Sequence, residues 1–195
     1  MGPVAEPDTP EDVENLRQIQ EQFDKLPIVK KLRASEDYVE WEAYSNFSPE
    51  EKARRLTTGP LRGSRGISTQ TIFWNEQEKT ATSVLYLGAG IGGWPGLVHG
   101  GALATLLDEA MGRVALRSFP ARTGVTANLN VNYRKPFFAD QFCIITAKCE
   151  PEQSNERKAI VKAEIRDSAG SLCTEASSVF VVPRNMTLRS LADGF

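Results

Sequence analysis

The chain has 195 residues, of which 41% are hydrophobic and 25% are charged, a composition that fits one globular domain with an appendage and excludes two full domains. The 23 lysines and arginines are balanced by 25 aspartates and glutamates, so we expect no nucleic-acid partner. The only histidine, His99, excludes a zinc site built from several imidazoles. We expect neither a metal ion nor a cofactor.

The cysteines and the first 20 residues indicate the cellular compartment in which the protein is found. Cys143, Cys149 and Cys173 form no CxxC motif, and we expect buried free thiols instead of disulfides. The chain has no run of 18 apolar residues, and its first 20 positions hold five acidic residues against one arginine. This pattern is unlike a secretory signal or a mitochondrial presequence. We therefore expect a soluble cytoplasmic protein without membrane insertion.

Residues 1–65 predict a helical and irregular N-terminal extension. Thr9 is followed by Pro10 and acidic residues, and apolar residues then recur at three- and four-residue spacing until Pro27, which predicts an amphipathic helix. Ser48 begins a second, short charged helix. The segment 59–66 predicts a glycine-rich loop. We expect the residues of this extension to serve packing, and none of them is a candidate catalytic residue.

The pattern changes at Ile67 to the alternation that is typical of strands. A glycine-rich stretch at 88–101 precedes an apolar helix at 102–116. The connections after this helix are too short for helical crossovers. We therefore predict an α+β fold, in which an antiparallel meander packs against a single helix. The predicted strands are 67–73, 80–87, 124–134, 141–149, 159–166 and 172–182.

The predicted helix has two unlike faces when its residues are placed 100° apart. The bulky face suits packing in the cup of a sheet, and the opposite face carries Asp108 as its only charge. Asp108 among small residues indicates a crowded, partly desolvated carboxylate, although an ordinary solubilising aspartate is the alternative. The bulky face comprises Leu103, Leu106, Leu107, Ala110 and Val114, and the small face comprises Gly101, Ala104, Thr105, Asp108, Gly112 and Ala115.

The start of this helix predicts a place for an oxyanion. Gly100 and Gly101 lack side chains, so we expect their N–H groups to be open to an incoming oxygen where the helix dipole favours negative charge. An oxyanion donor and a general base are the minimum equipment for acyl transfer. The strand at 124–134 alternates apolar and polar residues. Its polar face either meets water or places Thr126 and Asn128 in a site.

These residues carry a family resemblance. The stretch PGLVHGGA at 95–102, Asp108 nine residues after His99, and TANLNVNY at 126–133 before Pro136 resemble the hotdog-fold acyl-coenzyme A thioesterases. Within them the chain is most similar to the thioesterase superfamily members, relatives of the 4-hydroxybenzoyl-CoA and phenylacetate-pathway enzymes. The match covers about residues 84–182. It implies a long central helix wrapped by an antiparallel sheet, and a homodimer or dimer of dimers with shared active sites.

The resemblance also implies roles for individual residues. Gly100 would offer its N–H to the thioester oxygen, with Asp108 as general base or nucleophile. Thr126 of the partner subunit would orient water or the carboxylate, and His99 would lie near the thioester. Further substrate contacts would come from Gly101, Asn128 and two basic pairs that suit coenzyme A phosphates or plain surface, Arg134–Lys135 and Arg157–Lys158.

The sequence thus predicts an acyl-CoA thioesterase of fatty acid metabolism that releases a free acid and coenzyme A. One alternative is a hotdog hydratase or dehydratase, which would need its own acid–base pair. The other is a protein that binds acyl-CoA or an acyl carrier without turnover. The expected division of the chain is an extension at 1–65, a hotdog domain at 66–185 and a C-terminal tail at 186–195.

Overall fold

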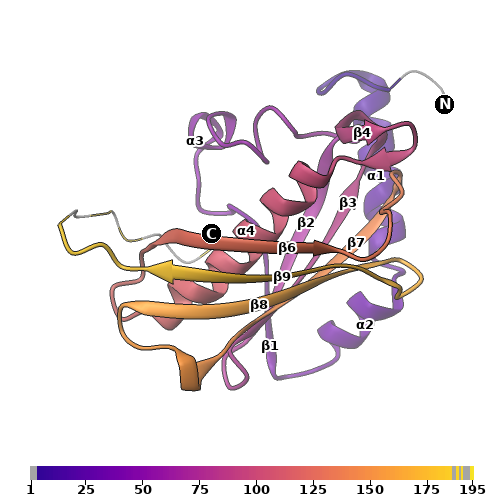
Figure 1. The fold of residues 1–195 in the computed structure, drawn as a ribbon. Helices are drawn as coiled ribbons and strands as arrows, with labels where there is room; N and C mark the ends of the chain where they lie inside the picture. The colour runs from indigo at the N-terminus through magenta and orange to yellow at the C-terminus, as the bar shows by residue number, and fades with distance from the viewer. Residues whose placement is uncertain (1–3, 186–187, 189, 191–193) are drawn as a thin grey trace.

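The described part of the chain forms one curved antiparallel sheet around a long helix (Figure 1). The structure is a computed structural model and describes residues 4–185, 188, 190 and 194–195. Its α-helices are α1 (Pro10–Phe23), α2 (Pro27–Arg33), α3 (Pro49–Ala53) and α4 (Gly100–Ser118). Its strands are β1 (Tyr38–Glu42), β2 (Ile67–Asn75), β3 (Thr80–Leu87), β4 (Gly92–Trp94), β5 (Leu97–Val98), β6 (Val125–Tyr133), β7 (Gln141–Cys149), β8 (Lys158–Asp167) and β9 (Leu172–Val181).

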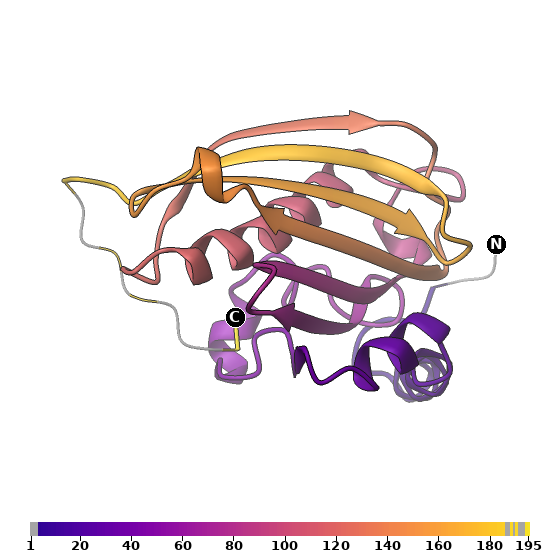
Figure 2. The same ribbon diagram turned by 90° about the horizontal axis from the view of Figure 1, so that it is seen from below.

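Helix α4 lies inside the curve of the sheet, as Figure 2 shows from below. The bulky face predicted from the sequence is the buried face, because every one of its leucines, with Ala110 and Val114, is nearly inaccessible to solvent. These side chains belong to one apolar cluster with residues of the strands, such as Leu85, Ile145 and Phe180. Burial of such side chains contributes about 1.5–3 kcal/mol each. The helix is therefore the centre of the core.

The sheet has the order β1-β2-β3-β7-β8-β9-β6. The antiparallel pairing and the strands of the C-terminal half are confirmed, and β7 has the predicted bounds. The meander prediction was wrong for the strand at 125–133, because β6 pairs with β9 and not with β7. Strands β7, β8 and β9 do form a meander. The curl of the sheet around α4 lets the short connection at 134–140 join β6, at the edge, to β7 beside β3.

The N-terminal extension contributes more to the fold than its sequence predicted. Helices α1 and α3 begin at the expected caps, with the Thr9 and Ser48 hydroxyls accepting backbone N–H groups. The extension also contains α2 and β1, which pairs with β2 at the edge of the sheet. Pro27, which interrupts the first apolar stripe, occupies the first turn of α2. Helices α1 and α2 cover the outer face of the sheet with Ile19, Phe23, Val29 and Leu32 against Phe73, Val84 and Phe142.

A buried carboxylate fastens α1 to the loop before β2. Asp12 is 2% exposed, and its Oδ1 accepts the N–H and the hydroxyl of Ser64, both at 2.7 Å. Its Oδ2 accepts the Asp8 N–H at 3.1 Å. Hydrogen bonds to a charged group contribute about 1.5–3 kcal/mol. Asp12 is thus the main polar anchor of the extension.

Replacing Asp12 with alanine should lower the free energy of unfolding at pH 7 by about 2–3 kcal/mol. Burial raises the pKa of the Asp12 carboxyl, but hydrogen bonds from Ser64 and Asp8 and the charge of Arg62 outweigh it, so the pKa lies below its usual value. The stabilisation is therefore present above the unfolded pKa, near 3.9, and is lost as the pH falls through the folded pKa. Urea unfolding at pH 7 and pH 3 measures the difference, with Glu11→Ala on the exposed side of the same turn as control. An equal loss at both pH values would contradict this role.

One further expectation, that of buried free thiols, is confirmed. Cys143, Cys149 and Cys173 are buried and free, and burial raises the pKa of the Cys143 thiol. Among the described residues, no helix is long and apolar enough to cross a membrane.

Candidate active site

Asp108 and Thr126 form a hydrogen-bonded pair between α4 and β6. The Thr126 hydroxyl donates to Asp108 Oδ1 at 2.8 Å. Asp108 is half-buried on the small face of α4, while Thr126 is exposed at the start of β6. The expected crowding around Asp108 is thus present in part. The hydroxyl holds one carboxylate oxygen, and no hydrogen bond from a described residue reaches the other, Oδ2.

A β-bulge aims Thr126 at the helix. Thr126 pairs with Phe180 and Asn128 pairs with Val179, so Ala127 has no partner on β9. A bulge adds one residue to a strand and changes which face the following side chains occupy. Phe180 faces the core, and Thr126 opposite it faces the core side as well. Strict alternation would have turned Thr126 away from α4.

This geometry corrects two expectations from the sequence. Thr126 was expected to act on the Asp108 of another subunit, but the two residues bond within one chain. Asn128 was expected to line the same site, but the bulge places it on the outer face of the sheet, opposite Val179. Its neighbours on that face are Asn130 and Asn132, which hydrogen-bond to each other at 3.2 Å. The alternative, a polar face in contact with water, holds for these asparagines.

The N-terminus of α4 is built from His99, Gly100 and Gly101. His99 is the N-cap, and its Nδ1 accepts the Gly101 N–H at 2.8 Å. The expectation that both glycine N–H groups are open was therefore wrong for Gly101, because the imidazole occupies its N–H. Within the described residues no acceptor is bonded to the Gly100 N–H. His99 thus has an observed capping role, and its catalytic role stays a prediction.

Tyr133 packs over this helix end, a contact that was not predicted from the sequence. Its hydroxyl donates to the Gly100 carbonyl at 2.7 Å, and a Cβ built on Gly100 would lie 3.3 Å from the phenol ring. Position 100 therefore suits glycine because of the close ring. The alternating pattern of the strand predicted only that Tyr133 lies on its apolar face. Its position as the last residue of β6 is the feature that could have indicated a contact with the helix end.

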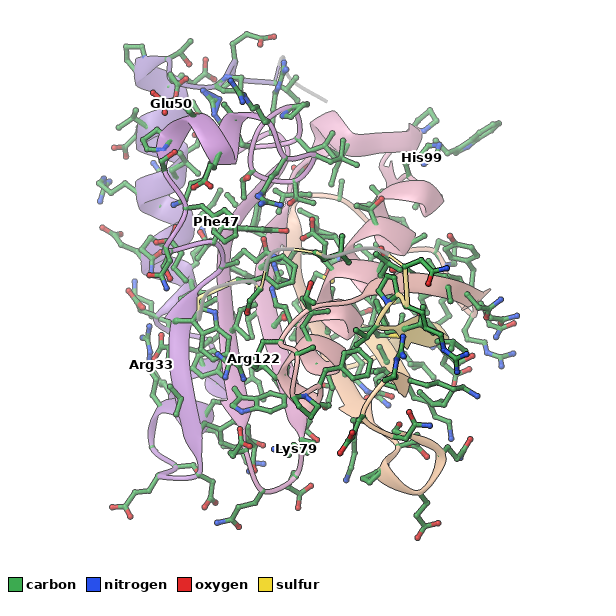
Figure 3. The ribbon with its side chains drawn as sticks, turned by 90° about the vertical axis from the view of Figure 1, so that its left-hand side faces the viewer. Arg33, Phe47, Glu50, Lys79, His99 and Arg122 are labelled. Carbon is green, nitrogen blue, oxygen red and sulfur yellow. The ribbon has the colours of Figure 1, made fainter. Side chains whose placement is uncertain are left out.

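The two ends of the site lie far apart in one chain. Gly100 and Asp108 are eight residues apart on α4, which is about 12 Å at 1.5 Å per residue. A donor to the thioester oxygen and a base near the carbonyl carbon must each lie within hydrogen-bond reach of one small group. Figure 3 shows His99 and Arg122 toward opposite ends of α4. One chain alone therefore does not bring the Gly100 N–H and the Asp108 carboxylate to the same small group.

The two basic pairs also lie at opposite ends of the sheet edge. The Arg134 and Lys135 N–H groups bond to the carbonyl of Cys173, at the start of β9, whereas Lys158 pairs with Val181 at its end. The eight residues between positions 173 and 181 span about 26 Å. Arg134 makes an exposed ion pair with Glu175 at 2.6 Å. The structure does not bring the pairs together in one chain. In the described part of the molecule, no cluster of three or more His, Cys, Asp or Glu side chains is arranged to hold a metal ion.

Comparison with known proteins finds a similar family and a similar fold. Residues 95–174, which include α4 and its N-terminal cap, β6, β7 and β8, match the family model described as thioesterase superfamily. Eighty of the 195 residues are thus similar to that family. The expected α+β hotdog fold is confirmed by the wrapped helix and by the likeness to a solved structure. The PaaI protein of the Escherichia coli phenylacetic acid degradation operon superimposes with a TM-score of 0.52 at 18% identity, over 62% of this chain and 81% of that protein.

The curated proteins that this chain matches are longer than the matched region. The mouse protein named acyl-coenzyme A thioesterase THEM4 is 30% identical over 139 residues, which cover 70% of this chain and 58% of that protein. A Saccharomyces cerevisiae protein named uncharacterized mitochondrial membrane protein FMP10 is 27% identical over 150 residues, which cover 75% of this chain and 57% of that protein. The chain thus spans less than two thirds of these relatives. The cytoplasmic location stays a prediction.

Proposed function

We propose that this chain hydrolyses acyl-CoA thioesters to a carboxylic acid and coenzyme A. The observation that carries the proposal is the Asp108 carboxylate held by the Thr126 hydroxyl at 2.8 Å on a helix whose N-terminus offers a free Gly100 N–H. Thioester hydrolysis needs a base for water and a donor for the oxyanion. The name of the mouse relative, acyl-coenzyme A thioesterase, supports the same substrate class.

In the proposed reaction Asp108 takes a proton from water while the water oxygen attacks the thioester carbonyl carbon. The Gly100 N–H, with the dipole of α4, stabilises the negative oxygen of the tetrahedral intermediate. The C–S bond then breaks and coenzyme A leaves as a thiolate. A thiol with a pKa of about 8.5 is a good leaving group, so the site needs no separate acid. In the alternative, the Asp108 carboxylate attacks the carbonyl carbon and expels coenzyme A, which forms a mixed anhydride. If water then attacks the Asp108 carbonyl carbon of that anhydride, a single turnover in ¹⁸O water leaves the label on Asp108.

The site is completed by a second copy of the chain. β6 is at the end of the sheet order, and an unpaired edge offers its N–H and C=O groups to another strand. Antiparallel pairing of β6 with β6 about a two-fold axis places the Tyr133 end of one strand beside the Val125 end of the other. Gly100 of one copy then approaches Asp108 of the other. We propose a homodimer, alone or in a dimer of dimers.

The same pairing of β6 with β6 brings the two basic pairs of different copies together. Arg134 and Lys135 follow the Tyr133 end of β6, and Arg157 and Lys158 adjoin the Val125 end through β9. A two-fold axis through β6 brings the first pair of one copy near the second pair of the other. Four cations then surround the mouth of each site, where the phosphates of coenzyme A would lie.

Replacing Thr126 with valine should lower kcat by roughly 10- to 100-fold, because loss of a hydrogen bond to a charged group costs about 1.5–3 kcal/mol. Thr126→Ser keeps the hydroxyl and should retain most of the activity. Thermal unfolding of both variants checks the fold. Equal rates for the valine and serine variants would show that the Thr126 hydroxyl does not contribute to catalysis.

The activity itself is tested by thiol release from acetyl-, hexanoyl-, palmitoyl- and benzoyl-CoA. Release from at least one of them, with ordinary saturation, is the expected result. Tight binding of acyl-CoA in calorimetry without thiol release would show that the protein binds acyl-CoA without hydrolysing it. Loss of the conjugated double bond from an enoyl-CoA without thiol release would indicate a hydratase.

A further inference from the structure

An exposed apolar face lies beside the N-terminus of α4. We call it the aromatic ribbon, and it consists of residues 92–98 with residues 137–139. Trp94 is 74% exposed and Phe138 is 62% exposed. Trp94 pairs with Leu97, and Leu97 forms a bridge with Phe138. Directly paired residues on neighbouring strands point to the same face, so the three side chains lie on one face of the ribbon.

The aromatic ribbon is firmly joined to the body of the protein. The Val98 N–H donates to the Phe137 carbonyl at 2.9 Å, and the Ala139 N–H donates to the Gly96 carbonyl at 3.0 Å. Phe137 and Val98 are buried. An exposed tryptophan on so well anchored a segment is unlike a solvated loop tip, and large exposed aromatic faces mark interaction sites.

Exposed apolar side chains also flank the open edge of the sheet. Val125 is 38% exposed at one end of β6 and Tyr133 is 53% exposed at the other. The aromatic ribbon continues this line beyond Tyr133, because the chain runs from Tyr133 into Phe137 and Phe138. Among the residues that the structure describes, the large exposed apolar side chains outside the extension all lie at this edge, namely Trp94, Val125, Tyr133 and Phe138.

We propose that the aromatic ribbon packs against a second copy of this chain, on the partner's Val125 and the loop 120–124. This inference rests on the proposed pairing of β6 with β6. The two-fold axis that brings the Tyr133 end of one strand to the Val125 end of the other also carries the ribbon past the end of the partner's β6. Trp94 and Phe138 are the rigid aromatic anchors of this contact.

The contact would position the oxyanion donor. The ribbon leads directly into His99, whose N–H donates to the Ile91 carbonyl at 2.9 Å, and then into Gly100. Seating the ribbon on the partner fixes the helix N-terminus of one copy against Asp108 of the other. Trp94 and Phe138 are thus positioning residues that make the assembled site depend on the ribbon.

The first test is association. Trp94→Ala should weaken the dimer at least about thirtyfold, the effect expected of an interface anchor, and its specific activity should fall on dilution and recover at high protein concentration. Val39→Ala, at an exposed apolar position on β1, should change neither. Recovery with concentration separates a weakened interface from a damaged fold. A variant that raises only the KM for acyl-CoA, with unchanged association, would assign the ribbon to the substrate and overturn the proposal.

The second test is crosslinking with a short bismaleimide. The native cysteines are buried, so engineered surface thiols react first. The double variant Val125→Cys, Phe138→Cys should yield a covalent dimer, and each single variant should not. Within one chain β6 separates these positions by about 26 Å, too far for a short bridge. A double variant that still sediments as a dimer but fails to crosslink would overturn the inference. Crosslinking without thiol release from any acyl-CoA would keep the interface and refute the proposed activity.

Discussion

Asp108→Asn should lower kcat for acyl-CoA hydrolysis by roughly 10²- to 10⁴-fold, because the amide cannot accept the proton of the attacking water. Asparagine has the same shape as aspartate, and its amide oxygen can still accept the Thr126 hydroxyl, which bonds to Oδ1 of Asp108 at 2.8 Å. The fold should therefore be unchanged. Steady-state thiol release measures the effect, and circular dichroism with thermal unfolding checks the structure.

The matched control for this variant is Asp37→Asn. Asp37 is an exposed aspartate in the extension, and it should be replaceable without loss of rate. Asp108→Asn should still bind acyl-CoA, because the substitution removes the base and not the substrate contacts. Full activity of Asp108→Asn would refute the mechanism proposed for this site.

Gly100→Pro should lower kcat by roughly 10²- to 10³-fold, because proline has no N–H to offer to the oxyanion. The substitution suits the helix, since proline is favoured at the first helical position. His99 has φ −62° and ψ 132°, values that the residue before proline adopts readily. The effect should therefore come from the lost donor and not from unfolding.

Gly100→Ala is the control that isolates the N–H group. Alanine and proline both add a Cβ, which would lie 3.3 Å from the Tyr133 ring and press on it, but alanine keeps the N–H. Alanine should therefore lose much less activity than proline. Equal rates for the two variants would mean that the loss comes from crowding against the Tyr133 ring. The Gly100 N–H would then not be the donor to the oxyanion.

The central helix and most strands could be predicted from the sequence because periodicity reports burial. The bulky face of α4 recurs with helical spacing, and its leucines are buried in the structure. β7 alternates between flanking turns and has the predicted bounds. The extension was harder to predict. β1 is short and largely exposed, and its pairing with β2 depends on an edge that only the folded sheet presents.

The details of the site depend on register, which no local pattern reveals. The unpaired Ala127 turns Thr126 toward Asp108 and leaves Asn128 outside, although strict alternation places both on one polar face. The His99 ring takes the Gly101 N–H, a choice that depends on a side-chain rotamer. Tyr133 reaches Gly100 across 33 residues of sequence. Such contacts arise from the assembly of α4 against β6.

The central claim is that each active site takes Gly100 from one copy and Asp108 from the other, and mixing two inactive variants tests it most directly. Gly100→Pro and Asp108→Asn should each be nearly inactive alone. After unfolding and refolding together, half of the dimers are mixed, and each mixed dimer has one site free of both substitutions, so roughly one quarter of the wild-type activity should return. A mixture no more active than its components would show that the two residues serve the same site from one chain.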